Sequence, residues 1–157
     1  MVSPDRLEKG APAAAGRQVS QAGIELVESA FDAWNGGEIE AFAAHMAEDV
    51  VWLEVSGRPE GAPTERLGRD RMRKSLESLF DAWESYHVEV ERIEEVGSRV
   101  LAIVREVARG RASGMQIDGR WGYLITVEDG LIVRIEAYRD AEQALEMAGL
   151  GESGIGA

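Results

Sequence analysis

The 157-residue sequence contains no cysteine and only two histidines, which are far apart in the chain. The lack of cysteine excludes a disulfide framework, a thiol nucleophile and every thiolate metal site. Two distant histidines do not supply the ligands of a zinc site, so no metal is expected. Any chemistry performed by this chain is therefore expected to depend on carboxylates and phenols, without an external cofactor.

Basic side chains are also scarce, with 17 Lys and Arg against 29 Asp and Glu and a formal net charge of −12. Nucleic-acid binding relies on cations that displace phosphate counterions, so nucleic acid is not an expected partner. No apolar run approaches the 18 or more residues of a membrane helix, and the Ala-rich patch at 11–15 is too short for a secretory core. The sequence therefore predicts no membrane partner and a cytoplasmic location.

The residues that are present indicate one globular domain, because 45% are hydrophobic and 29% are charged. We expect residues 1–19 to be a disordered leader, residues 20–150 to form the domain, and residues 151–157 to be a flexible tail. Only Glu54 and Glu136 among the acidic residues are expected to lie inside the domain. The other acids are expected to be a solvated coat.

The periodicity of apolar residues predicts an α+β fold. Ile24, Val27, Phe31 and Trp34 recur at helical spacing, and similar stripes appear in two later segments. β-branched and aromatic runs indicate five strands, of which the last four follow one another as a meander. Helices packed on one face of a curved antiparallel sheet are the expected architecture. The expected helices are 21–35, 38–47, 70–85 and 141–148, the expected strands are 50–55, 87–93, 99–109, 116–127 and 131–139, and 56–68 is an irregular connection.

Several stretches carry a family resemblance when they are taken in order. They are Phe31-Asp-Ala-Trp-Asn-Gly-Gly-Glu-Ile-Glu-Ala-Phe42, Ala47-Glu-Asp-Val-Val-Trp52, Gly68-Arg-Asp-Arg-Met-Arg73 and the tail from Arg134 to Leu150. Together they resemble SnoaL-like members of the nuclear transport factor 2-like superfamily. The resemblance implies a cone, in which a curved sheet wraps a long helix and leaves an apolar pocket open at one end. It also implies a homodimer formed through the outer face of the sheet. Relatives include ketosteroid isomerases, polyketide cyclases and proteins without a known reaction, so the fold does not determine the function.

Glu54 is the first candidate for a catalytic residue. The resemblance places it where ketosteroid isomerases have a catalytic Asp base, and the period of a strand places Trp52 on the same face. A carboxylate beside an indole in an apolar cavity is a stronger base than one in water. The alternative is a structural role, in which Glu54 forms a buried ion pair with Arg105 or Arg134.

Two positions depart from the isomerase pattern. The oxyanion-binding Tyr of that family falls at about Ala30, and its second acid falls near Gly122. Neither side chain can donate a hydrogen bond to a developing enolate. Steroid isomerisation is therefore not expected.

The last hairpin could supply other proton donors, depending on its register. A two-residue turn at Asp129-Gly130 would pair Val127 with Ile132 and place Tyr123 beside Glu136. Trp121, Tyr123, Glu136 and Tyr138 would then share one face with Arg134, and we favour this register. A three-residue loop with a bulge would instead place Tyr123 on the opposite face from Glu136.

Three classes of function remain open. The first is a pocket protein that binds a small apolar molecule and acts on it as a cofactor-free lyase, cyclase or isomerase, with Glu54, Tyr123, Glu136 and Tyr138 as its catalytic groups. The second is a non-catalytic binding protein with the same pocket. The third is a dimeric assembly module, because both faces of strand 99–109 carry apolar residues. The side chains expected to contact the ligand are Trp34, Trp52, Trp83, Arg105 and Trp121.

Overall fold

A computed structural model describes residues 12–55 and 64–150. Most of the expected leader, and the whole expected tail at 151–157, lie outside the described residues. The expected leader is helical from Pro12 onward, because the first helix begins there rather than near Gln21. No described helix is long and apolar enough to span a membrane.

Six strands form one curved sheet, which confirms the α+β class. Two details differ from the prediction. A short strand lies within the connection expected to be irregular, and β2 pairs with β7 in parallel, so the sheet is mixed. The other neighbours are antiparallel. The strands lie side by side in the order β3 (Thr64–Leu67), β2 (Met46–Glu54), β7 (Leu131–Tyr138), β6 (Gln116–Glu128), β5 (Arg99–Gly110) and β4 (Trp83–Val96).

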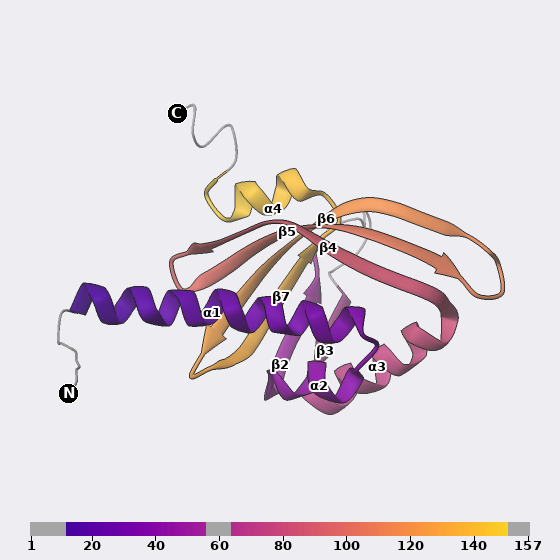
Figure 1. Cartoon of the computed structure of the whole chain (residues 1–157), viewed down its shortest axis with the longest axis horizontal. Helices are drawn as coiled ribbons and strands as arrows, with labels where there is room; N and C mark the ends of the chain where they lie inside the picture. The colour runs from indigo at the N-terminus through magenta and orange to yellow at the C-terminus, as the bar shows by residue number, and fades with distance from the viewer. Residues whose placement is uncertain (1–11, 56–63, 151–157) are drawn as a thin grey trace.

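In the described part of the chain, four helices cover the two faces of this sheet unequally (Figure 1). Three of them lie on the face that we call inner, and they are α1 (Pro12–Asn35), α2 (Ile39–Ala44) and α3 (Arg69–Ala82). The fourth, α4 (Ala141–Met147), packs on the outer face of β5, β6 and β7. The inner face and its helices therefore enclose the interior of the cone, whereas α4 closes a smaller core on the other side.

The main core lies between α1 and the inner face of the sheet. Val27 and Trp34 of α1 pack there with Val100, Val104 and Ile125 of the sheet. The apolar stripe expected along residues 24–34 is thus the face that the helix buries. A second core forms where α4 covers the outer face, and it contains Leu101, Ile103, Leu124, Tyr138 and Ala144.

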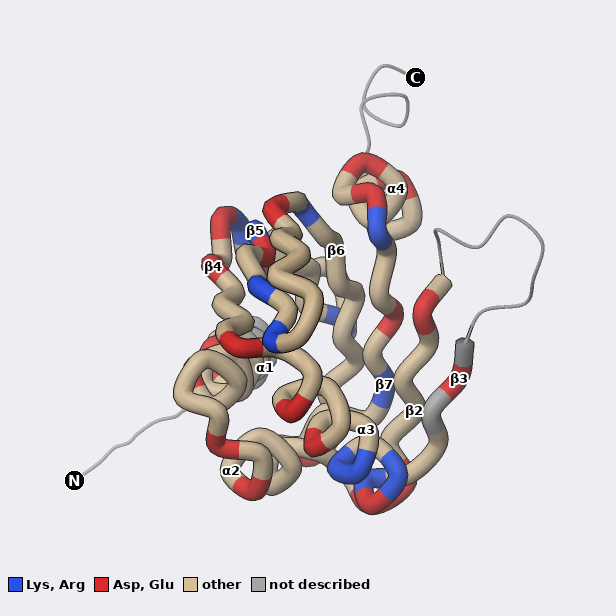
Figure 2. Tube along the Cα trace, turned by 90° about the vertical axis from the view of Figure 1, so that its right-hand side faces the viewer, with Lys and Arg blue, Asp and Glu red and all other residues tan. Residues whose placement is uncertain are grey.

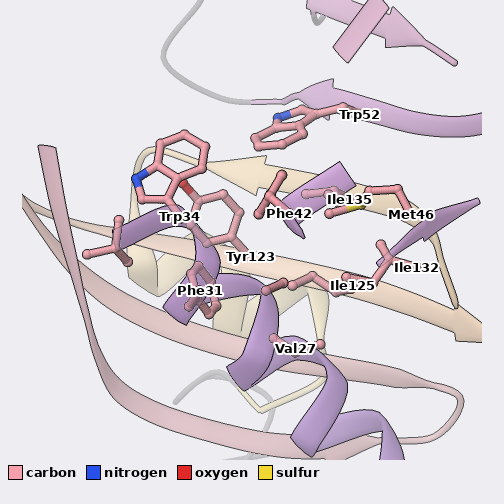
Figure 3. A pocket seen from close by; sticks show the side chains of 12 residues that line it. Val27, Phe31, Trp34, Phe42, Met46, Trp52, Tyr123, Ile125, Ile132 and Ile135 are labelled. Carbon is pink, nitrogen blue, oxygen red and sulfur yellow. The ribbon is translucent and has the colours of Figure 1, made fainter. Parts of the chain in front are cut away.

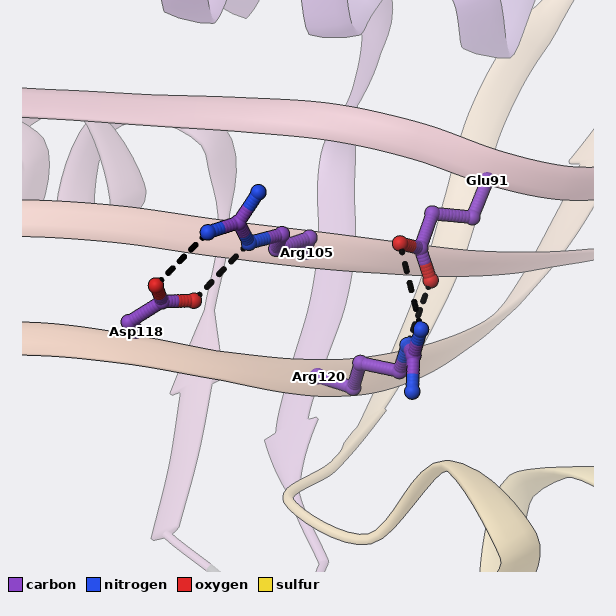
Figure 4. A network of polar contacts seen from close by, with 4 residues as sticks. All are labelled: Glu91, Arg105, Asp118 and Arg120. Atoms are coloured by element: carbon purple, nitrogen blue, oxygen red, sulfur yellow. Dashed lines mark hydrogen bonds and ion pairs between the residues drawn. The ribbon is translucent and has the colours of Figure 1, made fainter.

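The outer face beyond α4 is charged rather than apolar. Both faces of β5 carry apolar residues, as expected: Val100 and Val104 point to the inner core, whereas Leu101 and Ile103 lie on the outer face beneath α4. Two ion pairs cross the outer face: Arg105 binds Asp118, and Arg120 binds Glu91 (Figure 4). The homodimer through this face stays a prediction.

Charge is distributed unevenly over the rest of the surface. Acidic residues occur along exposed parts of the helices and strands, whereas basic residues gather at the start of α3 (Figure 2). This helix begins Arg69-Asp-Arg-Met-Arg-Lys74.

The final hairpin has the expected turn but a different register beyond it. Asp129 and Gly130 have φ angles of 54° and 76°, which are typical of a two-residue type I′ turn. Val127 pairs with Ile132, as predicted. A bulge then shifts the pairing by one residue, so that Tyr123 lies opposite Ala137 instead of Glu136. A one-residue shift reverses the face of every side chain beyond it, so the favoured register is wrong for Tyr123 and Glu136.

Candidate functional site

A cavity of about 130 Å³ lies between the inner face of the sheet and helices α1 and α3. This space exceeds the roughly 10–15 Å³ that one water requires. A smaller apolar cavity of about 30 Å³ adjoins it and shares Trp34, Trp52 and Tyr123 with it (Figure 3). Elements from the whole cone line the larger cavity: Trp34, Trp52, Glu54, Met72, Ser75, Leu76, Leu79, Tyr86, Glu106, Trp121, Tyr123 and Ala137.

Glu106 is the buried carboxylate of this cavity. Its exposed fraction is 2%, and it follows Val100, Ala102 and Val104 on the inner face of β5. The hydroxyl of Tyr86, on β4, donates to its Oε1 atom over 2.7 Å. The hydroxyl of Tyr123, on β6, donates to its Oε2 atom over 2.6 Å. Each carboxylate oxygen is therefore held by a phenol from a neighbouring strand.

Burial raises the pKa of Glu106, because the charged form loses contact with water. The two phenol hydrogen bonds act against this by stabilising the carboxylate, and the guanidinium of Arg139 also lowers the pKa. The negative charge of Glu54 raises it further. Glu106 is thus a carboxyl group whose proton affinity is higher than that of an ordinary glutamate.

The same arrangement makes the phenols weaker acids. Burial is the main reason that the pKa values of Tyr86 and Tyr123 lie above their usual range. The negative charge of Glu106 adds to this effect. Both phenols therefore retain their protons, and each donates its proton in a hydrogen bond to Glu106.

Glu54 lies on the wall of the cavity, near the end of β2. Glu54 is half-buried, and it lies with Trp52 on the inner face of the sheet, as the strand period predicted. The two arginines considered as partners have other interactions on the far side of the sheet. Arg105 binds Asp118, and Arg134 binds Glu136. Glu54 and Glu106 thus contribute two carboxyl groups to the cavity.

Glu136 and Tyr138 do not reach the cavity, because the bulge places them on the outer face. The hydroxyl of Tyr138 donates to Glu136 over 3.0 Å, and Nε of Arg134 donates to the same carboxylate over 2.7 Å. Burial beneath α4 and the bond to Glu136 raise the pKa of Tyr138 to about 12. Of the four predicted catalytic residues, the structure brings together only Glu54 and Tyr123.

Three of the four tryptophans line the cavity, namely Trp34, Trp52 and Trp121. Trp83 lies at the start of β4 and meets the ring of Tyr86 edge-on at 5.8 Å, beside a separate surface hollow. Arg105, which was expected to contact the ligand, is on the outer face with 46% of its side chain exposed. Arg105 therefore faces away from the cavity, because alternate residues of β5 point to opposite faces.

Glu106 and Tyr86 were not among the predicted site residues, although the sequence carries a signal for Glu106. Val100, Ala102, Val104 and Ala108 are all buried, and Glu106 has the same parity. Strict alternation along β5 therefore places the carboxyl of Glu106 among these apolar side chains. Tyr86 had no comparable signal, because it lies close to the junction between α3 and β4.

The arrangement offers carboxyl and phenol groups for a ligand or for proton transfer. Within residues 12–55 and 64–150, no three His, Asp or Glu side chains are grouped so that they could hold a metal ion. Among these residues, Nε1 of Trp34 is a buried donor without a hydrogen-bond acceptor. The polar groups that line the cavity are thus the two carboxyls, the two phenols, the hydroxyl of Ser75 and the indoles.

A curved sheet around a long helix, with a cavity inside the cone, defines a cone-shaped α+β protein with an internal pocket. Residues 27–135, more than half of the chain, match the model of the SnoaL-like domain family. The chain belongs to this family. A search of curated proteins found no match.

Solved structures share the fold at low sequence identity. An epoxide hydrolase of the LEH-like type from M. tuberculosis is 18% identical, with a TM-score of 0.67 and coverage of 87% of this chain and 96% of that chain. A protein provisionally assigned as a SnoaL-like polyketide cyclase, from Jannaschia sp. CCS1, is 18% identical, with a TM-score of 0.67 and coverage of 90% and 96%. An NTF2-like protein of unknown function from Burkholderia pseudomallei is 16% identical, with a TM-score of 0.66 and coverage of 81% and 97%. These similarities establish the nuclear transport factor 2-like fold.

Proposed function

We propose that this protein binds a small, mainly apolar molecule in the cavity and transfers a proton on it without an external cofactor. The observation that carries the proposal is the burial of Glu106 on the cavity wall between two phenols. A buried carboxylate with raised proton affinity is suited to act as a general base. Isomerases, cyclases and lyases all use such a step, and solved structures with the same fold carry the names polyketide cyclase, ketosteroid isomerase and epoxide hydrolase.

The three-residue network links proton uptake to the release of a donor. When the Glu106 carboxylate removes a proton from a carbon beside a carbonyl, the C–H electron pair forms a C=C bond and the carbonyl pair moves to oxygen. Glu106 is then a carboxylic acid, and its own O–H can donate to the oxygen of Tyr123. The phenol O–H of Tyr123 is thereby free to donate to the new oxyanion. The proton on Glu106 can return to another carbon or accompany a leaving group.

Glu54 has one of two roles in this proposal. As a second carboxylate, it raises the pKa of Glu106 and so favours proton uptake there. Alternatively, it is itself the base, as the family resemblance implies, and Glu106 then holds the phenols in position. Because the two roles place the transferred proton on different residues, single variants separate them.

Exchange of hydrogen for deuterium on a model ketone tests the proposal without knowledge of the natural substrate. 2-Tetralone incubated with the protein in D2O should lose its α-hydrogens faster than in buffer alone, as followed by NMR. We expect Glu106→Gln to reduce this rate by about two orders of magnitude or more, which is the usual contribution of a positioned base. Glu136→Gln is the matched control, since Glu136 is also bonded to a tyrosine but lies on the outer face.

The result also identifies the base. If Glu54→Gln abolishes exchange and Glu106→Gln retains it, Glu54 is the base. If none of the proteins exceeds the buffer rate, proton transfer on a ketone is excluded as the function of this cavity.

A second candidate is non-catalytic binding in the same cavity. It is favoured by the fact that both oxygens of Glu106 already accept hydrogen bonds, as in a structural buried acid. Native mass spectrometry of the purified protein distinguishes this candidate, because a retained small molecule in a protein that shows no exchange indicates a binding function.

A further inference from the structure

We propose that the cavity prefers a protonated organic amine, with the ammonium group at Glu106 and the apolar body toward Phe42 and Ile125. This inference depends on the proposed function only in taking the cavity as a ligand site. It adds the chemical class of the ligand. Four features support it: the direction of the hydrogen bonds, the charge of the wall, its aromatic rings and the shape of the cavity.

The hydrogen bonds around Glu106 leave acceptors, not donors, for a ligand. A phenol has one proton, and Tyr86 and Tyr123 each donate theirs to Glu106. The remaining lone pairs of the two phenol oxygens and of the carboxylate can only accept. A ligand that meets this group while Glu106 is ionised must therefore be a donor, and an ammonium group is the strongest donor among common organic groups.

The charge of the wall points to the same class. Two carboxyl groups, Glu54 and Glu106, line the cavity, and none of the described residues lining it is Lys, Arg or His. The cation that lowers the pKa of Glu106 is Arg139, which follows β7, lies over the ring of Trp121 and is not part of the lining. A cationic ligand would therefore meet two carboxyl groups on the wall, with Arg139 outside the lining as the cation that acts on Glu106.

Aromatic rings complete the surroundings of the cavity. Trp34, Trp52 and Trp121 line it together with the two tyrosines. Aromatic faces attract cations, and Trp121 already does so in this fold, since the guanidinium of Arg139 lies 5.4 Å from its ring centroid. Tyr123 stacks beside Trp121, with 6.4 Å between ring centroids and 14° between planes.

The shape provides separate places for the two parts of an amine. The polar cavity of about 130 Å³ contains the carboxyls, and the apolar cavity of about 30 Å³ continues from it beyond Tyr123. The apolar part is lined by Phe31, Phe42, Ile125 and other hydrophobic side chains (Figure 3). A small arylalkylamine fits these surroundings if its ring lies mainly among the indoles of the larger cavity and only its edge reaches the smaller, apolar one.

The preference should depend on pH in a defined direction. The groups that face Glu106 are Tyr86 on β4, Tyr123 on β6 and Glu54 on β2, with Arg139 after β7. When Glu106 is protonated, it no longer attracts a cation, and one phenol proton is released to donate to an oxygen ligand. Amine binding should therefore strengthen as pH rises through the pKa of Glu106, which burial holds above its usual range.

Isothermal titration calorimetry with 2-phenylethylamine and 2-phenylethanol tests the inference on the full-length protein. The two probes have the same shape, but only the amine is a cation at pH 7.5. We expect the amine to bind about tenfold more tightly, which corresponds to about 1.4 kcal/mol. Glu106→Gln should remove this difference and leave binding of the alcohol, whereas Glu136→Gln should retain it. Tyr123→Phe serves as a second variant, which keeps Glu106 and its charge, and should retain most of the preference.

Each outcome separates the two proposals. The amine inference is wrong if the alcohol binds as tightly as the amine. It is also wrong if Glu106→Gln retains the preference with an unchanged circular dichroism spectrum. In both cases the proposal that the cavity binds a small molecule still stands. If neither probe binds, both the amine inference and the small-molecule pocket are overturned. An amine affinity that does not rise with pH between pH 4 and pH 9, while the amine stays protonated, would also contradict the inference.

Discussion

At the scale of single residues, the position of one carboxyl group determines what the cavity can do. Glu106 is held by two phenols and has a raised proton affinity, whereas Glu136 has a similar phenol contact on the outer face and a cationic neighbour. The two glutamates differ mainly in their surroundings. Glu136→Gln is therefore a control for the loss of a phenol-bonded carboxylate outside the cavity.

The stability of the fold should report the ionisation of Glu106. Its folded pKa is raised above the unfolded value, so its contribution is fully present below the unfolded pKa and is lost as pH rises through the folded pKa. The free energy of unfolding of the wild type, minus that of Glu106→Gln, should therefore fall with rising pH. Each unit of pKa difference corresponds to about 1.4 kcal/mol. Urea denaturation of both proteins from pH 4 to pH 9 measures this difference in the free energy of unfolding. A difference that stays constant or rises with pH would contradict the raised pKa of Glu106.

Gly122 marks a close approach between β6 and α4. A Cβ atom at this position would lie 2.2 Å from Cβ of Ala144 and 3.5 Å from Cα of Ala141. Gly122→Ala should therefore destabilise the protein by about 1–3 kcal/mol, because α4 must shift to relieve the overlap. Gly119→Ala is the control on the same strand, since no atom lies within 4 Å of its Cβ. Equal urea midpoints for the two variants would show that α4 does not pack this closely.

At the scale of elements, the sequence predicts periodic segments well and register poorly. The stripe from Ile24 to Trp34 and the turn at Asp129-Gly130 depend on local chemistry, so both could be predicted. The bulge beside Val127 has no local marker, and it alone places Tyr123 and Glu136 on opposite faces. The fold class could thus be predicted from the sequence, whereas the faces on which Tyr123 and Glu136 lie depended on one unpaired residue.

The N-cap of α4 is a feature of a single element. The side chain of Asp140 accepts a hydrogen bond from the backbone N–H of Glu142 over 2.9 Å. Asp140→Ala should reduce the free energy of unfolding by about 1 kcal/mol, as is typical for the loss of an N-cap. Asp140→Asn should retain most of the stability, because its amide oxygen can accept the same bond. Chemical denaturation compares the three proteins, and equal losses in both variants would mean that the cap contributes through charge alone.

At the scale of the whole molecule, the two faces of the sheet have different surroundings. The inner face is enclosed by three helices and contains the cavity, so a ligand site there is complete within one chain. The outer face is covered by α4 over one part and is crossed by exposed ion pairs over the rest. An interface on the outer face would therefore bring together charged groups around a few apolar side chains, and it would be more polar than a core.

The family expectation of a homodimer through this outer face can be tested at Val107. Its exposed fraction is 40%, and it lies between Arg105 and Arg109 on β5, where a partner would cover it. Light scattering of the wild type should give twice the 17.1 kDa chain mass, and Val107→Lys should shift it toward one chain by burying an unpaired charge. Leu67→Lys is the matched control, because Leu67 is 49% exposed but lies on β3 at the other edge of the sheet. A wild type of single-chain mass would exclude the homodimer, and a dimer that dissociates only with Leu67→Lys would move the interface to that edge.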